Sequence, residues 1–370
     1  MKVICLILAA LAASALPLAA QQPVPLPDWA EAQIAETAQR FEAWRGKDPA
    51  VVFPIVADVH SARPAIAEPP DFSDSKMHIL FVCRAAEKFK ADFIADLGDI
   101  GLDTPATADP SNAEARLQAN VQLYGHAPVP VLFAMGNHDH GRTAYRVTNK
   151  MYGARFNGET QKKCPTVVTG PDGDYGYFDV PGKGCRVFFL NSSDGAYYGF
   201  SLPQLHFLAD ALRLPADGCA VVLQHMCVNA IGRWTSYPDR AEHGDVYAKI
   251  LEDFAAGASG SLGAFAWDFS RNRNARLIAS ISGDSHFDRQ TRTNGVTYVI
   301  TQGYGGISPK ECSERCIVTP FSRARTMLID VAAIKPGKGE FRMFRIGAGG
   351  AARDRSFAFP PSKQPDGWNR

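Results

Sequence analysis

The sequence lacks an excess of charge of either sign. Its 370 residues carry 39 lysines and arginines against 38 aspartates and glutamates, a formal net charge of +1. Surfaces for nucleic acid or anionic membranes normally carry a clear excess of basic side chains, so the balance supports neither partner. The chain also has no CxxC pair, which argues against a thiolate metal site. It has no internal repeat, low-complexity tract or clear linker, which favours one main domain with mixed sheets.

The first twenty residues differ from the rest of the chain. Lys2 supplies a positive charge, residues 3–11 are apolar, and small residues offer cleavage points after Ala15 or Ala20. An uncleaved membrane anchor is the alternative, but the segment is short and rich in alanine. No cysteine lies at the cleavage region, so a lipid anchor is not indicated. We therefore predict a signal peptide over residues 1–20, no stable membrane anchor, and a secreted or periplasmic protein.

Seven cysteines remain once the one at position 5 is removed with the signal peptide. Because an exported protein meets oxidising conditions, some of them are expected to pair. We predict one disulfide between Cys312 and Cys316, within one loop, and another between Cys164 and Cys185, across a hairpin. The odd count leaves at least one free thiol, and Cys83, in an apolar helical stretch, is expected to be buried and inert.

The pattern along the chain predicts alternating strands and helices. An amphipathic helix is expected over residues 28–45, capped by Asp28 and ended by Gly46. Glycine and aromatic residues over 153–185 predict β-hairpin material, and residues 202–214 predict a helix. Further strands are expected at 51–56, 93–97, 129–134, 186–190, 221–223, 277–281, 297–301, 326–331 and 340–346, and a helix at 77–90. The expected organisation is an N-terminal extension at 21–50, the main domain at 51–359 and a flexible tail at 360–370.

Five short runs of metal-ligand residue types each follow an apolar, strand-like run. They are Asp58-Val59-His60, Gly98-Asp99, Gly136-Asn137-His138-Asp139, Gln224-His225 and Gly283-Asp284-Ser285-His286. In open α/β sheets ligands bind just beyond the carboxyl ends of the strands, so we expect these side chains to converge at one edge. Taken singly, each could be a helix cap, a turn residue or a hydrogen-bonded histidine. Together they indicate a site for two divalent metal ions, which is typical of phosphate-ester hydrolysis.

The order of these runs resembles the motif set of the calcineurin-like metallophosphoesterase superfamily. The resemblance extends from about Phe53 to Ile307. It implies an α/β fold in which two mixed β-sheets form a sandwich flanked by helices. It also implies that metal-activated hydroxide attacks phosphorus.

The resemblance assigns a role to each site residue. It implies that Asp58, His60 and His286 hold a first metal ion and that Asp99 bridges both ions. The second ion would be held by Asn137, His225 and the residue at position 284. Mixed oxygen and nitrogen ligands suit Mn, Fe, Zn or Mg, and the sequence does not choose among them.

Position 284 departs from the family pattern. The family usually has histidine there, whereas this chain has Asp284. An aspartate can ligate with a harder oxygen, which would favour Mn or Mg over Zn, or it can hydrogen-bond a ligand from outside the coordination sphere. We favour direct ligation.

His138 corresponds to the family's histidine over the leaving-group oxygen, where an imidazole can donate a proton. Either Asp103 or Asp139 could orient it. Arg63 and Arg142 could contact the substrate phosphate, although arginines at such places are more often solvated or paired.

These features predict an exported metal-dependent phosphoesterase acting on small-molecule or macromolecular phosphate esters, whether monoesters or diesters. No tyrosine closely follows Asp99, which argues against a purple acid phosphatase. Two alternatives remain open. One is a non-catalytic protein that binds a phosphorylated ligand on the same scaffold, and the other is a serine/threonine protein phosphatase.

Overall fold

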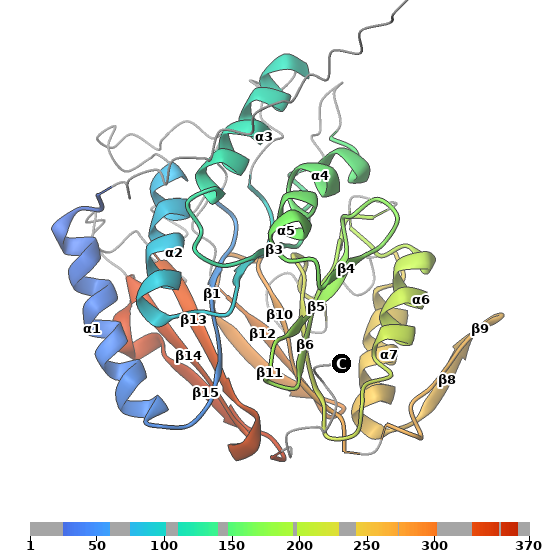
Figure 1. The fold of residues 1–370 in the computed structure, drawn as a ribbon. Coiled ribbons are helices and arrows are strands. Elements are labelled where there is room, and N and C mark those ends of the chain that lie inside the picture. The colour runs from blue at the N-terminus through green and yellow to red at the C-terminus, as the bar shows by residue number, and fades with distance from the viewer. Residues whose placement is uncertain are drawn as a thin grey trace, which may run out of the picture.

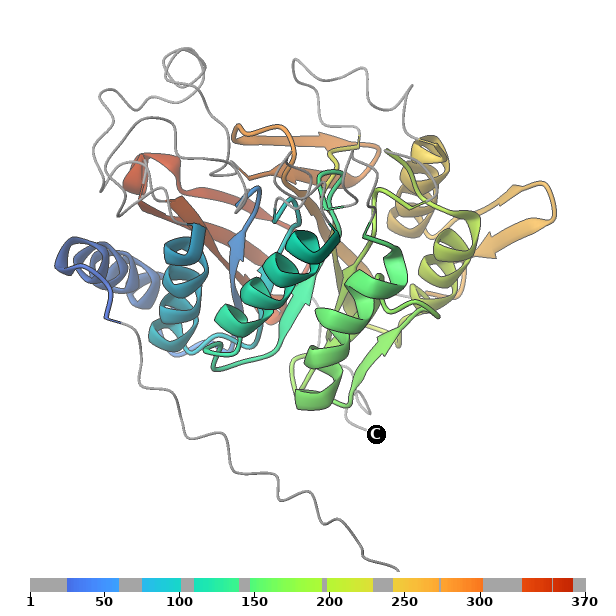
Figure 2. The same ribbon diagram turned by 90° about the horizontal axis from the view of Figure 1, so that it is seen from above.

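A computed structural model describes residues 25–59, 75–100, 110–139, 147–194, 198–228, 242–272, 274–301, 328–347 and 349–361. Two large sheets lie face to face, with helices over both outer faces (Figures 1 and 2). This arrangement confirms the predicted two-sheet α/β sandwich. In the part of the chain described, no helix is long and apolar enough to cross a membrane.

The first sheet has the strand order β15-β14-β13-β1-β2-β3. Its strands are β1 (Val51–Val56), β2 (Ile94–Asp96), β3 (Val131–Phe133), β13 (Leu328–Lys335), β14 (Glu340–Gly347) and β15 (Arg355–Ala358). Strands β1, β2 and β3 are parallel, and β13 joins β1 in the antiparallel sense. The three parallel strands therefore bring their carboxyl ends to one edge.

The second sheet has the order β11-β12-β10-β7-β6-β5-β4. Its strands are β4 (Val167–Thr169), β5 (Gly176–Val180), β6 (Cys185–Phe189), β7 (Cys219–Leu223), β10 (Arg276–Ser282), β11 (Arg289–Thr293) and β12 (Val296–Ile300). The four central strands β12, β10, β7 and β6 are parallel. A separate hairpin is formed by β8 (Ser259–Leu262) and β9 (Phe265–Asp268).

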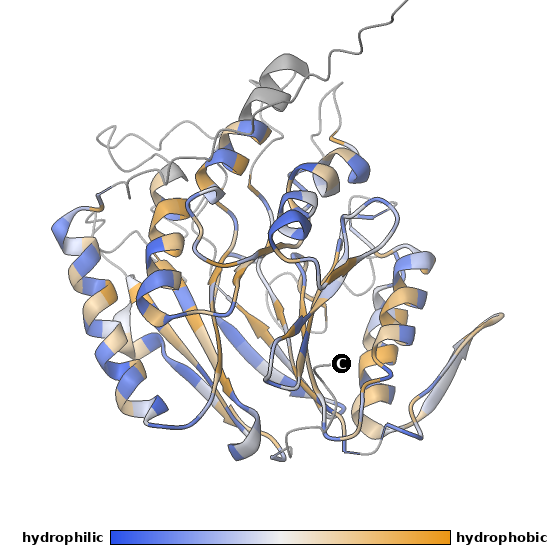
Figure 3. Cartoon of the chain, viewed as in Figure 1, coloured by the Kyte–Doolittle hydropathy of each residue, from blue (hydrophilic) through white to orange (hydrophobic). Residues whose placement is uncertain are grey.

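Three apolar layers hold the sandwich together. The middle layer lies between the sheets and includes Phe53, Phe93 and Val221. An outer layer packs the helices α1 (Asp28–Arg45), α2 (Ser75–Phe89), α3 (Pro110–Tyr124) and α4 (Asn149–Arg155) onto the first sheet. The other outer layer packs α6 (Leu202–Ala211) and α7 (Gly244–Ala256) onto the second sheet. In Figure 3 helices α1 and α2 alternate apolar and polar residues along their length.

Most predicted elements are present, but some differ from the prediction. Helix α1 spans the predicted residues and ends at Gly46, but Asp28 is its first residue and the capping position is Pro27. The stretch expected to be hairpin material begins with a second helix, α5 (Asn157–Lys163), before β4 starts. Its seven residues contain one glycine and no apolar side chain, so no apolar periodicity marks it as a helix.

The predicted Cys164–Cys185 disulfide is wrong, because both cysteines are free thiols. Cys164 precedes β4, which pairs with β5, and β5 separates it from Cys185 on β6. Two strand spacings are about 10 Å, beyond the 4.4–6.8 Å that a disulfide spans between Cα atoms. Cys185 instead lies opposite Cys219 on β7. Cys83 is buried and free as predicted, and the proposed Cys312–Cys316 pair falls outside the described residues.

Candidate metal centre

Seven of the eight predicted site residues lie in the described ranges, and all seven follow strands at the same edge of the sandwich. His60 is outside these ranges. From the first sheet, Asp58 follows β1, Asp99 follows β2, and Asn137 and His138 follow β3; from the second, His225 follows β7, and Asp284 and His286 follow β10. The candidate centre therefore lies where the edges of the two sheets meet.

His225, which follows a strand of the second sheet, contacts residues that follow strands of the first sheet. Its ring Nδ1 lies 2.8 Å from the main-chain oxygen of Leu97, and because a carbonyl only accepts, Nδ1 carries a proton. The other ring nitrogen, Nε2, lies 3.0 Å from Asn137 Oδ1, 3.2 Å from Asp99 Oδ2 and 3.7 Å from Asp284 Oδ1. A neutral imidazole would present a lone pair to three oxygen atoms. That arrangement is stable when a cation lies among them, either a proton on Nε2 or a metal ion.

The second half of the cluster joins Asp58 to the loop after β10. Asp58 Oδ1 lies 3.5 Å from His286 Nε2, and the main-chain amide of Asp284 donates to Asp58 Oδ2 at 3.2 Å. Asp284 Oδ2 is buried, and no group of the described residues donates a hydrogen bond to it. Asp58, Asp99 and His225 each offer a ligand atom, and these atoms lie within 4.8 Å of one another. The donor set is thus carboxylate, amide oxygen and imidazole, which fits hard or borderline divalent cations.

The charges of this cluster are not balanced by basic side chains among the contacts described. Burial raises the pKa of Asp58 well above its ordinary range and that of Asp284 to about 6, because ionised carboxylates lose hydration there. Burial alone would lower the pKa of His225, but Asp99, followed by Asp58 and Asp284, raises it well above its ordinary range. The site therefore takes up positive charge, which a bound cation would supply.

Asp139 connects two of the loops that form the centre. Its Oδ2 accepts hydrogen bonds from the main-chain amides of Asp99 and Gly136, both at 2.9 Å. It thereby ties the loop after β2 to the loop after β3. His138 donates its main-chain amide to Asp99 Oδ1 at 2.7 Å, and its Nε2 lies 3.7 Å from Asp99 Oδ2. Asp103, the other candidate for orienting His138, is outside the described residues.

The backbone at the centre is unusual in two ways. Asp58, Asp99, Asp284 and His286 all have left-handed conformations, with φ of 55°, 54°, 62° and 53°. Non-glycine residues adopt this region at a cost, and such residues cluster at functional sites. In addition, a Cβ on Gly136 would overlap Asp99 Oδ1, and one on Gly283 would lie 2.8 Å from Asp58 Oδ2. These two glycines of the motifs let the carboxylates approach the neighbouring backbone.

Exposure shows from which side the centre is open. The side chains of Asp58, Asp99 and His225 are almost fully buried, whereas those of His138 and His286 are 17% and 26% exposed. A substrate would therefore approach past these two imidazoles.

Sequence reasoning missed Asp96, which helps to shape the centre. This buried residue of β2 accepts hydrogen bonds from the Tyr124 hydroxyl and, at 2.9 Å, from the amide of Gly98. Burial raises its pKa to about 6. The available signal was a single acidic residue inside an otherwise apolar strand.

The sequence also offered two arginines as possible contacts for the substrate phosphate. Arg63 and Arg142 lie outside the described residues.

Comparison with solved structures supports the fold. A dimetal phosphatase from Danio rerio is 14% identical, with a TM-score of 0.56, and the match covers 84% of this chain and all of that one. A purple acid phosphatase from yellow lupin (Lupinus luteus) seeds is 11% identical, with a TM-score of 0.48, over 85% of this chain and 53% of the other. At 14% identity the likeness to the Danio rerio structure shows shared architecture. No match is found among curated proteins.

The family is shown by the sequence itself. The profile of the calcineurin-like phosphoesterases matches residues 53–286, well over half of the chain. All five motifs, from Asp58 to His286, lie within that span. The chain belongs to the calcineurin-like phosphoesterase family.

Proposed function

We propose that the protein is an exported, metal-dependent phosphoesterase that hydrolyses phosphate monoesters or diesters at this centre. The observation that carries the proposal is the environment of His225 Nε2, which faces one amide and two carboxylate oxygens and so requires a cation. Two divalent ions at such a site would withdraw electrons from a phosphoryl group and lower the pKa of the attacking water.

The described residues divide into two groups of ligands. Asp58 and His286, 3.5 Å apart, would hold the first ion together with His60. Asn137, His225 and Asp284 would hold the second, and Asp99, next to both groups, would be shared. Asp284 is proposed as a direct ligand because its Oδ2 is buried and accepts no hydrogen bond within the described part of the chain. Its carboxylate would make the second site harder and favour Mn or Mg over Zn.

His138 is proposed to assist the leaving group. Its imidazole is partly exposed at the opening of the centre, and its main chain is fixed by the hydrogen bond to Asp99 Oδ1. An imidazole held there can donate a proton to the ester oxygen as the bond to phosphorus breaks. It would thus act on the substrate, while the carboxylates below it hold the ions.

Export is proposed from the first twenty residues alone, whose charged start, apolar centre and small residues are typical of a signal peptide. Expression of the full chain in a bacterium, followed by fractionation and intact-mass measurement, tests it. The expected mass is that of a chain beginning after Ala15 or Ala20. A full-length chain in the cytoplasm would contradict export.

The activity is tested with para-nitrophenyl phosphate and its bis ester. Metal-stripped protein is reloaded with Mn, Zn, Fe or Mg and compared with Asp99→Asn, using Asp268→Asn, an exposed position on β9, as the matched control. We expect metal-restored turnover that is lost only in Asp99→Asn, and the preferred ester defines the substrate class. Metal binding without turnover would favour a phosphoryl-ligand binding protein. Turnover confined to phosphoserine or phosphothreonine peptides would identify a protein phosphatase.

A further inference from the structure

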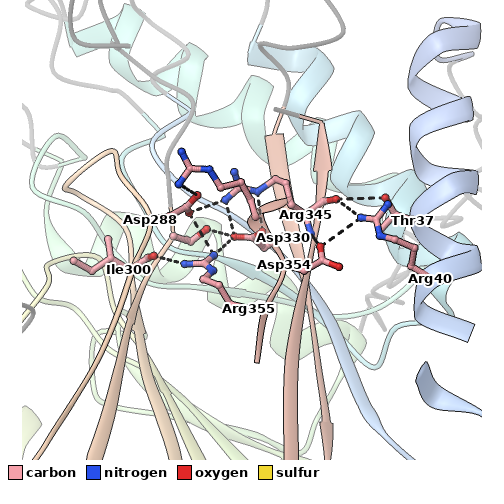
Figure 4. A network of polar contacts seen from close by, with 10 residues as sticks. Thr37, Arg40, Asp288, Ile300, Asp330, Arg345, Asp354 and Arg355 are labelled. Carbon is pink, nitrogen blue, oxygen red and sulfur yellow. Dashed lines mark hydrogen bonds and ion pairs between the residues drawn. The ribbon is translucent and has the colours of Figure 1, made fainter. Parts of the chain in front are cut away.

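A buried ionic cluster lies beside the candidate centre. Arg345 of β14 is fully buried and contacts Asp330 of β13, with its Nε 2.9 Å from Oδ1. Its guanidinium also lies 2.7 Å from Asp288, in the loop between β10 and β11. Arg355 of β15 joins the same two carboxylates, 2.5 Å from Asp330 and 3.4 Å from Asp288. Figure 4 shows these side chains converging from both sheets.

The cluster continues away from the centre to helix α1. The main-chain amide of Arg345 donates to Asp354 Oδ1 at 3.0 Å, and its carbonyl accepts from Arg40 of α1 at 2.9 Å. Asp354 also lies 3.4 Å from Arg40 and 3.5 Å from Arg342. The cluster therefore has two ends. Asp288 lies at the end next to the loop after β10, and Asp354 lies at the end next to α1.

The charges of the central pair are fixed. Burial alone would raise the pKa of Asp330, but Arg345 and then Arg355 lower it to about 2. Burial alone would lower the pKa of Arg345, but Asp330 and Asp288 raise it above its ordinary value. The pair is ionised throughout the neutral pH range, so its contacts do not change over any range in which activity would be measured.

Asp288 lies two residues beyond His286, at the far end of a strained loop. Asp284 and His286 are both left-handed within that loop. Such conformations persist when the surrounding structure holds the segment at both ends. The near end is fixed, because the amide of Gly283 donates to the His225 carbonyl at 2.9 Å and Gly283 packs against Asp58. The far end is held by the guanidinium groups on Asp288.

We propose that Asp288, held by Arg345 and Arg355, is a positioning residue that fixes the imidazole of His286 at the metal centre. The inference rests on the proposed function, in which His286 binds an ion. It makes the C-terminal strands β13–β15 part of the site, since they supply both arginines and the carboxylate that neutralises them. A partner outside the coordination sphere commonly changes metal affinity by about 10- to 100-fold.

The test compares Asp288→Ala with Asp354→Ala. Both substitutions remove one carboxylate from the same cluster, but only the first lies next to the His286 loop. Arg345 keeps Asp330 as a partner in both variants, so the central pair stays neutralised. Mn binding is measured by calorimetry on the metal-stripped full chain, and the melting temperature is measured without metal.

We expect Asp288→Ala to lose about 10- to 100-fold in affinity for one of two Mn ions, while Asp354→Ala stays within about twofold of wild type. Wild-type Mn affinity in Asp288→Ala, or an equal loss of affinity in both variants, would overturn the inference. The cluster would then only stabilise the fold. If Asp288→Ala does not fold, Asp288→Asn keeps the shape of the side chain and removes its charge. A smaller loss of Mn affinity in that variant supports the proposal, and an unchanged affinity overturns it. Wild-type protein that binds no divalent ion would instead overturn the proposed function itself.

Discussion

At the scale of single residues, the centre depends on glycine as well as on its ligands. Any side chain on Gly136 would overlap Asp99 Oδ1, the carboxylate proposed to bridge the ions. We expect Gly136→Ala to move that carboxylate and to lower kcat by about 100-fold, since small misplacements of catalytic groups have effects of that size. The control is Gly158→Ala on α5, where a Cβ would lie 3.4 Å from its nearest neighbour. Equal kcat in both variants would show that Asp99 tolerates displacement.

Asp284 is the residue at which metal preference is proposed to be set. Replacing it with histidine exchanges a carboxylate oxygen for a nitrogen ligand, which suits Zn better than Mn or Mg. We expect Asp284→His to raise the ratio of Zn to Mn bound from an equimolar mixture, measured by elemental analysis after desalting. Asp268→His, at an exposed position, should leave the ratio unchanged. An unaltered ratio in Asp284→His would place the residue outside the coordination sphere.

The residues named by the sequence and those found only in the structure differ in kind. Asp58, Asp99 and His225 could be predicted because each follows an apolar run in a recognisable motif. The role of Asp96, and the bond by which Asp139 holds the loop after β2, could not be assigned from the sequence, because the partners, the Tyr124 hydroxyl and the Asp99 amide, are 28 and 40 residues away along the chain. Such contacts depend on how strands pack side by side, and no spacing along the chain encodes that.

At the scale of elements, strands that end in a motif were predicted most completely. Strand β1 matches its expected bounds, and β10 extends the expected run by one residue at each end. Helix α7 and the β8–β9 hairpin were not predicted. The helix has an apolar face, but it lies next to no motif, and the hairpin is too short for its alternation to stand out.

Helix α1, in the predicted N-terminal extension, packs into an outer layer of the core. Phe41 is fully buried and makes edge contacts with Phe89 of α2 and Phe344 of β14, at ring separations of 5.2 and 5.7 Å. We expect Phe41→Ala to lower the free energy of unfolding by about 3–5 kcal/mol in urea denaturation. The exposed Gln39→Ala, on the same helix, should change it little. A negligible effect of Phe41→Ala would make α1 a separable extension after all.

At the scale of the whole molecule, the sandwich brings the ends of strands from two sheets together at one acidic edge. The first sheet supplies Asp58, Asp99 and Asn137, and the second supplies His225 and the loop after β10. Neither sheet alone presents a complete set of ligands. The fold therefore concentrates negative charge at the seam between the sheets, although the chain as a whole is nearly neutral.

That concentration predicts how stability depends on pH when metal is absent. Burial raises the pKa of Asp284 to about 6 and that of Asp139 to about 7, from an ordinary value of 3.8. Between pH 4 and 7 the unfolded chain has lost these protons while the folded chain retains them, so stability must fall as pH rises. The raised pKa of His225 acts in the same direction, because its stabilising proton is lost as pH rises further.

A bound metal ion would compete with those protons, so its stabilising effect should grow as pH rises. The metal-free protein should therefore melt several degrees lower at pH 8 than at pH 5, and the increase in melting temperature caused by Mn should grow over the same range. Differential scanning fluorimetry with chelator or with saturating Mn measures both curves. Asp139→Asn, which cannot ionise, should flatten the metal-free curve. A metal-free melting temperature that rises from pH 5 to 8 would show that other groups control the stability of the fold. In that case the carboxylates at the seam would have to be neutralised by contacts other than those with His225 and with one another.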